Sequence, residues 1–197
     1  MTNCYGDRKA TSVPSTLDDA TELNLACLDQ MSGLLAEISV EEYCRSRPPV
    51  FPSSIGAHLR HVLDHYDSLE KALEAGVIDY HSREREPETE TNPLRARARI
   101  EQIQRNLERK KISSHPATLD IKLRISAEDP SSTIPTTWER EFYFVLSHTL
   151  HHLALIATNA RDQGLTLPEE FGVAPSTLFH QKMKLRREAQ HATACQQ

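Results

Sequence analysis

Four long stretches of this 197-residue chain repeat their apolar residues at helical spacing, and this pattern constrains the fold more than any other feature. In the first stretch, from about residue 17 to 38, Leu28, Met31 and Leu35 recur three and four positions apart. That spacing places them on one face of an α-helix. Four amphipathic helices of this length can bury a shared core, so the predicted fold class is all-α, a four-helix bundle.

Residues that favour helix starts and ends mark the other predicted helices. Ser53 or Ser54 is suited to cap the second helix, because a serine oxygen accepts backbone N–H groups at a helix start. Gly76 is suited to end it, since glycine adopts the left-handed conformation that follows a last helical turn. Pro93 is favoured in the first turn of the third helix. The predicted helices span about residues 17–38, 55–76, 93–111 and 138–164.

A segment between the third and fourth predicted helices has a different period. Its apolar residues alternate with polar ones, which is typical of a strand with one buried face. Residues 128–132 form a predicted turn, and residues 133–137 form a short returning strand. The sequence therefore predicts a small β-hairpin before the last long helix. The alternating apolar residues are Leu119, Ile121, Leu123 and Ile125.

Length and composition favour one helical domain. We expect this domain over residues 15–180, with a disordered tail at residues 1–14 and a polar tail at residues 181–197. No run of about 18 apolar residues predicts a membrane span. The N-terminus lacks the apolar core of a signal peptide. We therefore expect a cytoplasmic protein that does not bind membranes.

Charge and cysteine spacing exclude two further classes of protein. The formal net charge of −5 argues against a general nucleic-acid-binding protein, which needs a basic face against phosphates. Basic runs at residues 109–111 and 182–187 are interpreted as solvated helix faces or ends. The four cysteines are scattered and form no CxxC pair, so free thiols are expected.

The fourth predicted helix carries three histidines in the apolar run FYFVLSHTLHHLALIA. His148 and His152 lie one turn apart and about 40° around the axis, so they share a face, whereas His151 is displaced to one side. An HxxxH pair on one face can present two neutral imidazoles to one metal ion. The alternative is a pair of hydrogen-bonded histidines in the core.

The second predicted helix carries a matching stripe of His58, His61 and His65. Six of the ten histidines thus fall in two stripes that both point toward the interior of the predicted bundle. Buried imidazoles without partners are costly, which favours a metal site. Hydrogen-bonded clusters, solvent-facing stripes and a pH-sensing bundle without metal are the alternatives.

The order and spacing of these motifs resemble the DinB-like family of metal-binding four-helix proteins. SSIGAHLRHV opens the second helix at residues 53–62, and SHTLHH lies on the last helix at residues 147–152. The resemblance covers about residues 17–164. It implies an up-down-down-up bundle with a crossover connection and a site of three histidines with open positions. Carried over to this chain, the implied ligands are His61 (seven residues after Ser54), His148 and His152.

The resemblance also implies a cofactor and a chemistry. The expected cofactor is a divalent transition metal, zinc first, with nickel, iron or manganese as alternatives. The chain is similar as well to the N-terminal domains of ergothioneine- and ovothiol-forming sulfoxide synthases and to transferases that use bacillithiol or mycothiol. Many family members place an Arg-Gly-Gln run after the last histidine. This chain has Leu-Ala-Leu at Leu153–Leu155 instead.

Four further residues are candidates for the site. His65 is a candidate catalytic residue beside the ligands, or a polar edge of its helix. Glu141 could orient a ligand or act as a base, or it could be a helix-start glutamate favoured by the helix dipole. Arg83 and Arg85 could bind a substrate carboxylate if their loop folds over the bundle, and otherwise belong to a solvated charge run.

The predicted function is that of a metal-dependent enzyme acting on a small molecule. Thiol transfer to an electrophile and hydrolysis of an amide or ester both fit an open three-histidine site. The expected partners are the substrate, a low-molecular-weight thiol and a second copy of the chain in a homodimer. The alternative is a non-catalytic metal-binding bundle, related to stress, that acts through dimerisation.

Overall fold

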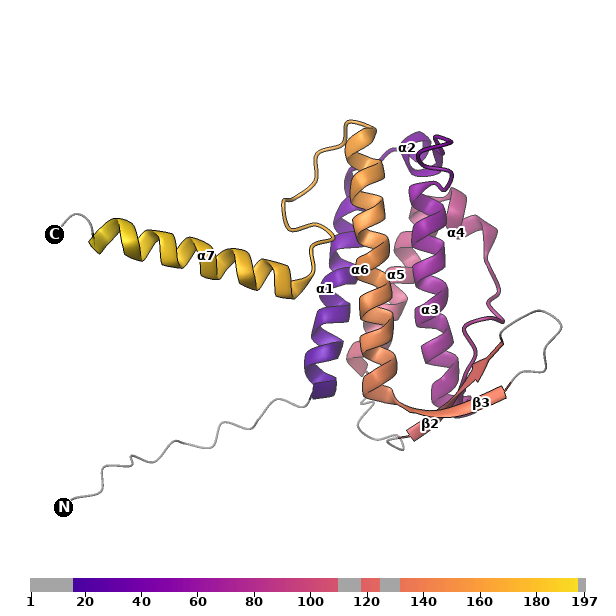
Figure 1. Ribbon diagram of the computed structural model, residues 1–197. Helices are drawn as coiled ribbons and strands as arrows, with labels where there is room; N and C mark the ends of the chain where they lie inside the picture. Colours follow the sequence, from indigo (N-terminus) through magenta and orange to yellow (C-terminus); the bar gives the residue numbers. More distant parts are fainter. Residues whose placement is uncertain (1–15, 110–117, 125–131, 195–197) are drawn as a thin grey trace, which may run out of the picture.

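The chain is mainly helical, with a small three-stranded sheet at one end of the long helices (Figure 1). The computed structural model describes residues 16–109, 118–124 and 132–194, so the predicted tail at residues 1–14 lies outside it. The helices are α1 (Thr16–Glu37), α2 (Val40–Cys44), α3 (Ile55–Ala75), α4 (Pro87–Thr91), α5 (Pro93–Arg109), α6 (Trp138–Asp162) and α7 (Pro175–Ala194). The strands are β1 (Val77–Ile78), β2 (Thr118–Leu123) and β3 (Ser132–Thr137).

The predicted capping residues begin and end the long helices. The Ser54 hydroxyl accepts the N–H of Ala57 at 3.0 Å at the start of α3. Gly76 ends α3 with a φ of 67° and donates its N–H to the Ala72 carbonyl at 2.8 Å. Thr137 caps α6 in the same way as Ser54 caps α3. These local signals are therefore confirmed, and they fix where the two histidine-bearing helices begin.

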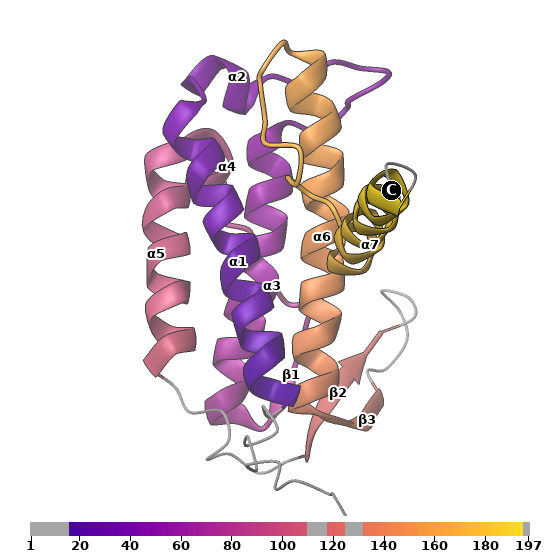
Figure 2. The same cartoon turned by 90° about the vertical axis from the view of Figure 1, so that its left-hand side faces the viewer.

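The helices α1, α3, α5 and α6 pack through their apolar faces. α1 contacts α5 and α6, and α3 contacts the same two helices on the other side (Figures 1 and 2). Removing these faces from water is the main favourable contribution to folding. The shared core includes Leu28 and Met31 of α1, Leu59 and Leu63 of α3, Ile100 of α5 and Leu153 of α6, all with no exposed surface.

The sheet contains the predicted hairpin and one more strand. β2 and β3 pair antiparallel, with Ile121 opposite Ile134. β1 adds a parallel edge to β2, with Val77 opposite Asp120. Two residues are too few for a recognisable period, so β1 was not predicted. Most of the expected turn at residues 128–132 lies outside the described residues.

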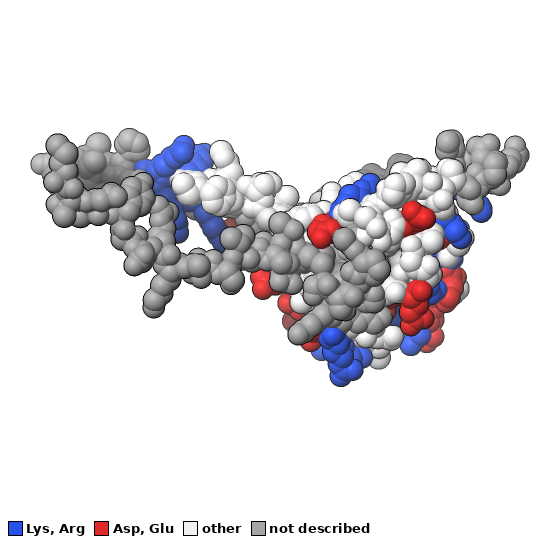
Figure 3. Space-filling model, turned by 90° about the horizontal axis from the view of Figure 1, so that it is seen from below, with Lys and Arg blue, Asp and Glu red and all other residues white. Residues whose placement is uncertain are grey.

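Three helices differ from the expectation. α2 and α4 have five residues each and lie between the predicted helices, where no helix was expected. α7 begins after the last long predicted helix and continues into the region assigned to a polar tail. It projects away from the other helices (Figure 1), and basic side chains gather on this arm in the view from below (Figure 3). The exposed basic residues of α7 are Lys182, Lys184, Arg186 and Arg187.

Two smaller predictions concern membranes and thiols. Within the described ranges, no helix combines the length and the apolar character that a bilayer span requires. Cys27 and Cys44 are free, as predicted. Cys4 and Cys195 lie outside the described residues.

α4 holds the loop that follows β1 against α3. The Tyr43 hydroxyl donates to the Thr89 carbonyl at 2.6 Å. Gly56 permits this close approach, because a Cβ there would stand 2.6 Å from Cε1 of Tyr43 and would collide with the Glu90 carbonyl. The buried Arg99 donates to the Thr89 hydroxyl at 3.1 Å from α5. Loop residues 79–86 are thereby confined to the side of α3 that carries the histidines.

Candidate metal centre

Histidines of α3 and α6 meet in one cluster between the two helices. The closest rings are those of His65 and His148, with centroids 4.1 Å apart. His65 and His152 are buried, whereas the other rings are partly exposed, so the cluster can be reached from outside the protein. His151 is exposed, as its helical offset predicts. The cluster consists of His58, His61, His65, His148 and His152.

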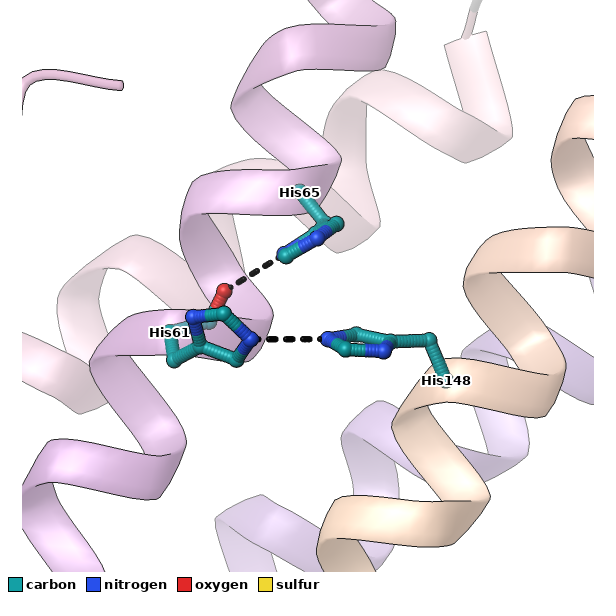
Figure 4. Close-up of side chains that lie close together, drawn as sticks. All are labelled: His61, His65 and His148. Atoms are coloured by element: carbon teal, nitrogen blue, oxygen red, sulfur yellow. Dashed lines mark hydrogen bonds between the residues drawn. The ribbon is translucent and has the colours of Figure 1, made fainter. Parts of the chain in front are cut away.

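His61 and His148 face each other across the gap between the helices. Their Nε2 atoms are 3.0 Å apart (Figure 4). Two ligands of one tetrahedral ion, each at about 2.0–2.1 Å, would be about 3.3 Å apart. The pair is thus spaced for an N–H···N hydrogen bond, and a small shift would let both nitrogens bind one ion.

His65 supplies a third nitrogen on the same side. Its Nδ1 lies 2.8 Å from the His61 carbonyl oxygen, one turn earlier in α3 (Figure 4). A carbonyl only accepts, so Nδ1 carries the proton and Nε2 keeps a lone pair. Ligand nitrogens of His61, His65 and His148 all lie within 4.8 Å of one another. These three histidines could hold one metal ion.

This group differs in one member from the set that the resemblance implied. The expected ligands were His61, His148 and His152, and the structure brings His65 rather than His152 into the closest group. The His152 ring is near, with its centroid 4.5 Å from that of His148. However, its Nδ1 lies 3.0 Å from Nδ1 of His58. A role for His152 as a ligand stays a prediction.

Burial keeps the clustered imidazoles neutral. Burial and, next, the positive charge of Arg83 lower the pKa of His61 to about 4. Burial lowers the pKa of His65 and of His152 to about 3. The pKa values of the remaining two rings are also lowered, mainly by burial. Only a neutral imidazole has a lone pair for a metal, so the cluster is in the required state at pH 7.

The loop between β1 and α4 brings one of the two predicted arginines to the cluster. The Asp79 carboxylate accepts the N–H groups of His81 and Ser82, both at 3.0 Å, and so turns the chain back toward α3. Arg83 follows this turn, and its Nη1 lies 3.0 Å from Nδ1 of His61. In the described part of the chain, no hydrogen bond or ion pair joins the exposed Arg85 to the cluster.

Glu141 lies beside the cluster but bonds to other groups. It is fully buried and accepts hydrogen bonds from Tyr80 at 2.9 Å, Thr136 at 2.7 Å and Arg140 at 2.6 Å. The Tyr80 ring stacks on His65, with centroids 5.3 Å apart and planes 28° apart. Burial, together with Glu141, raises the pKa of Tyr80. Glu141 therefore reaches His65 through Tyr80, and its catalytic role stays a prediction.

Tyr80 is a part of this site that the sequence did not indicate. It stands in a polar loop with no periodic neighbours, and nothing in its local sequence distinguishes it from a surface tyrosine. It follows β1 closely, and its hydroxyl and ring meet Glu141 and Phe144 of α6.

Comparisons with known proteins add little to this geometry. No model of a known protein family matches the chain. FK506-binding protein 5 of Rhizopus delemar is 33% identical over 107 residues, which are 54% of this chain. The matched stretch covers 28% of that protein's length, so the similarity is partial. The candidate metal centre rests on its own geometry.

Proposed function

We propose that this protein is a metal-dependent enzyme of the DinB-like kind, with a divalent ion bound between α3 and α6. The observation that carries the proposal is the 3.0 Å approach of His61 Nε2 to His148 Nε2, with the neutral His65 beside them. His65 is the third ligand that proximity favours, and His152 is the one that the family pattern favours. Zinc suits three imidazoles and an open position, and nickel, iron and manganese are the alternatives.

The arrangement of the long helices supports the finer fold assignment within this proposal. In Figure 1, α1 and α6 run upward and α3 runs downward, and Figure 2 shows α5 beside α1. The chain returns through loop residues 79–86 and α4 before α5, so that α3 and α5 run in the same direction. These directions support our proposal of an up-down-down-up four-helix bundle with a crossover.

The residues around the site suit chemistry on a small molecule. When bound, a divalent ion with an open position supplies Lewis-acid activation of water or of a thiolate. His61 and His148 are only partly buried, so a substrate can approach them. Tyr80 and Glu141 close the inner side of the cluster and limit the access of water. Thiol transfer to an electrophile and hydrolysis of an amide or ester are the two proposed reactions.

One observation favours a second, non-catalytic function. α7 projects from the body and exposes two large apolar side chains, Phe179 at 67% and Leu185 at 65%. Exposed apolar groups on a projecting helix are typical of a surface that contacts another chain. On this alternative, the protein is a metal-binding, stress-related bundle that acts as a homodimer.

A turnover screen on protein with known metal content separates the two functions. Zinc-loaded protein would be tested with small electrophiles and several low-molecular-weight thiols, and with simple amides and esters. We expect turnover that is abolished in His148→Ala together with metal retention, and that is kept in the matched variant His151→Ala. If Glu141 moves a proton, Glu141→Gln keeps the metal and slows turnover about 10²–10⁴-fold. No turnover by fully metal-loaded protein would favour the non-catalytic function.

A further inference from the structure

Arg83 forms no ion pair with any carboxylate that the structure describes, and its Nε is buried without a hydrogen-bond partner there. Asp64 lies within electrostatic reach of Arg83. However, Asp64 already pairs with Arg60 at 2.9 Å and with Arg99 at 3.2 Å. A guanidinium stays protonated in proteins, so a positive charge without a directly bonded carboxylate lies beside the histidines.

The hydrogen bond from Arg83 also fixes the proton of His61. Nη1 of Arg83 can only donate, so Nδ1 of His61 accepts, and the ring proton of His61 lies on Nε2. That nitrogen then donates to Nε2 of His148. A metal on His61 Nε2 requires the proton on Nδ1, where it would point at the N–H of Arg83. Binding of an ion therefore breaks the contact between Arg83 and His61.

An ion at this site would also stand next to the guanidinium. Nη1 of Arg83 lies 3.3 Å from Nδ1 and 3.4 Å from Nε2 of His65, so it sits over the ring of a proposed ligand. Two cations at such close range repel each other unless an anion lies between them. The three histidines are neutral and cannot supply that negative charge.

We propose, on the basis of the metal centre proposed above, that Arg83 binds the carboxylate of a small anionic substrate next to the ion. A planar carboxylate matches the fork of a guanidinium and offers the single negative charge that the site lacks. Arg83 also borders a cavity of about 100 Å³ on the side away from the histidines, where four acidic residues and Lys71 share the lining, so a singly charged anion suits this arginine better than phosphate. The acidic residues of this lining are Asp64, Asp67, Asp79 and Glu84.

Metal affinity measured with and without a carboxylate tests this inference. Acetate would serve as the carboxylate and methanesulfonate as the control anion, at equal ionic strength, with zinc affinity measured by competition with a chelating dye. Because binding linkage is reciprocal, we expect acetate to tighten zinc binding at least about tenfold in the unchanged protein. Complexation of free zinc by acetate would weaken the apparent affinity, so this artefact has the opposite sign.

Variants of the loop show which arginine is responsible. We expect Arg83→Met to bind zinc at least as tightly without acetate and to lose the acetate effect, and Arg83→Lys to keep part of it. Arg85→Met removes the same charge from the same loop and should keep the effect in full. An acetate effect that survives Arg83→Met, or is lost in Arg85→Met as well, would overturn the inference. Absence of zinc binding in the unchanged protein would instead overturn the metal centre on which it rests.

Discussion

At the scale of single residues, the chemistry of the cluster depends on which ring nitrogen carries each proton. His65 has its Nδ1 proton fixed by the His61 carbonyl, which leaves Nε2 ready to bind an ion. Such a bond to the other ring nitrogen is the usual way in which proteins orient a histidine ligand. His152 can be oriented by His58 in the same manner. In both residues a neighbouring group can therefore bond to Nδ1 and leave Nε2 free for an ion. Their relative importance as ligands is a question for metal-affinity measurements.

The first prediction ranks these two histidines as ligands. We expect His65→Ala to weaken zinc binding by more than about 100-fold, because it removes a nitrogen of the closest group. His152→Ala should weaken it by about 10–100-fold, as is typical for groups that orient ligands. Isothermal titration or dye competition would measure both. The reverse order would restore the ligand set His61, His148 and His152.

The second prediction concerns the pH dependence of stability in metal-free protein. Burial lowers the pKa of His65 from its ordinary value of 6.5 to about 3, so the unfolded chain takes up the proton first as the pH falls. The stabilisation is fully present above about pH 6.5 and is lost progressively toward pH 3. We expect the free energy of unfolding in urea to fall between pH 7.5 and pH 5.5.

A matched pair of variants isolates the cluster in this experiment. His65→Gln cannot take up a proton and should show a smaller fall in stability over the same pH range. His180→Gln removes an exposed histidine of α7 and should behave like the unchanged protein. Equal pH dependence in all three proteins would contradict a buried, neutral His65.

At the scale of helices and strands, the sequence predicts what is long and periodic. α1, α3, α5 and α6 were predicted from apolar spacing and from residues such as Ser54 and Gly76, and the hairpin from alternation. α4 and β1 were not predicted, because five and two residues show no period. α2 was also not predicted, although its start could have been recognised. Ser39 and Glu42 have the spacing of a capping box, and in the structure each side chain bonds to the backbone N–H of the other residue.

The third prediction tests how α4 is held against α3. Gly56→Ala should lower the free energy of unfolding by about 1–3 kcal/mol, because the added methyl group collides with Tyr43 and with the Glu90 carbonyl. Gly33→Ala is the matched control in α1, where no heavy atom lies within 4 Å of the added Cβ. That variant should gain about 0.5–1 kcal/mol from helix propensity. Equal effects of the two substitutions on urea unfolding would show that the contact between α3 and α4 is not tight.

At the scale of the whole molecule, the site depends on α3 and α6 packing side by side. The two histidine stripes could be predicted to meet, because each lies on the inward face of its helix. His61 and His148 meet although they are 87 residues apart in the sequence. Which of His65 and His152 lies with His61 and His148 could not be predicted from the sequence. This depends on side-chain rotamers and on the group to which each ring is hydrogen-bonded. The place of Arg83 follows from the turn that Asp79 forms with the N–H groups of His81 and Ser82, which no apolar period marks in the sequence.

The fourth prediction separates the fold from the metal. Treatment with a chelator should leave the helical circular dichroism unchanged, because side chains of α1, α3, α5 and α6 form an apolar core without the ion. The melting temperature should fall, since an ion that binds only the folded state contributes about 2.7 kcal/mol at 100 times its Kd. Loss of the helical signal on chelation would show that the ion is required for folding.

The most direct test of the metal centre is the metal content of the protein purified without an affinity tag. Elemental analysis after dialysis should find about one equivalent of a divalent transition metal per chain. His61→Ala and His148→Ala should lose it, and His151→Ala, which removes an exposed histidine of the same helix, should retain it. A zinc-supplied protein without bound metal, or a full equivalent in both His61→Ala and His148→Ala, would contradict a metal site between α3 and α6.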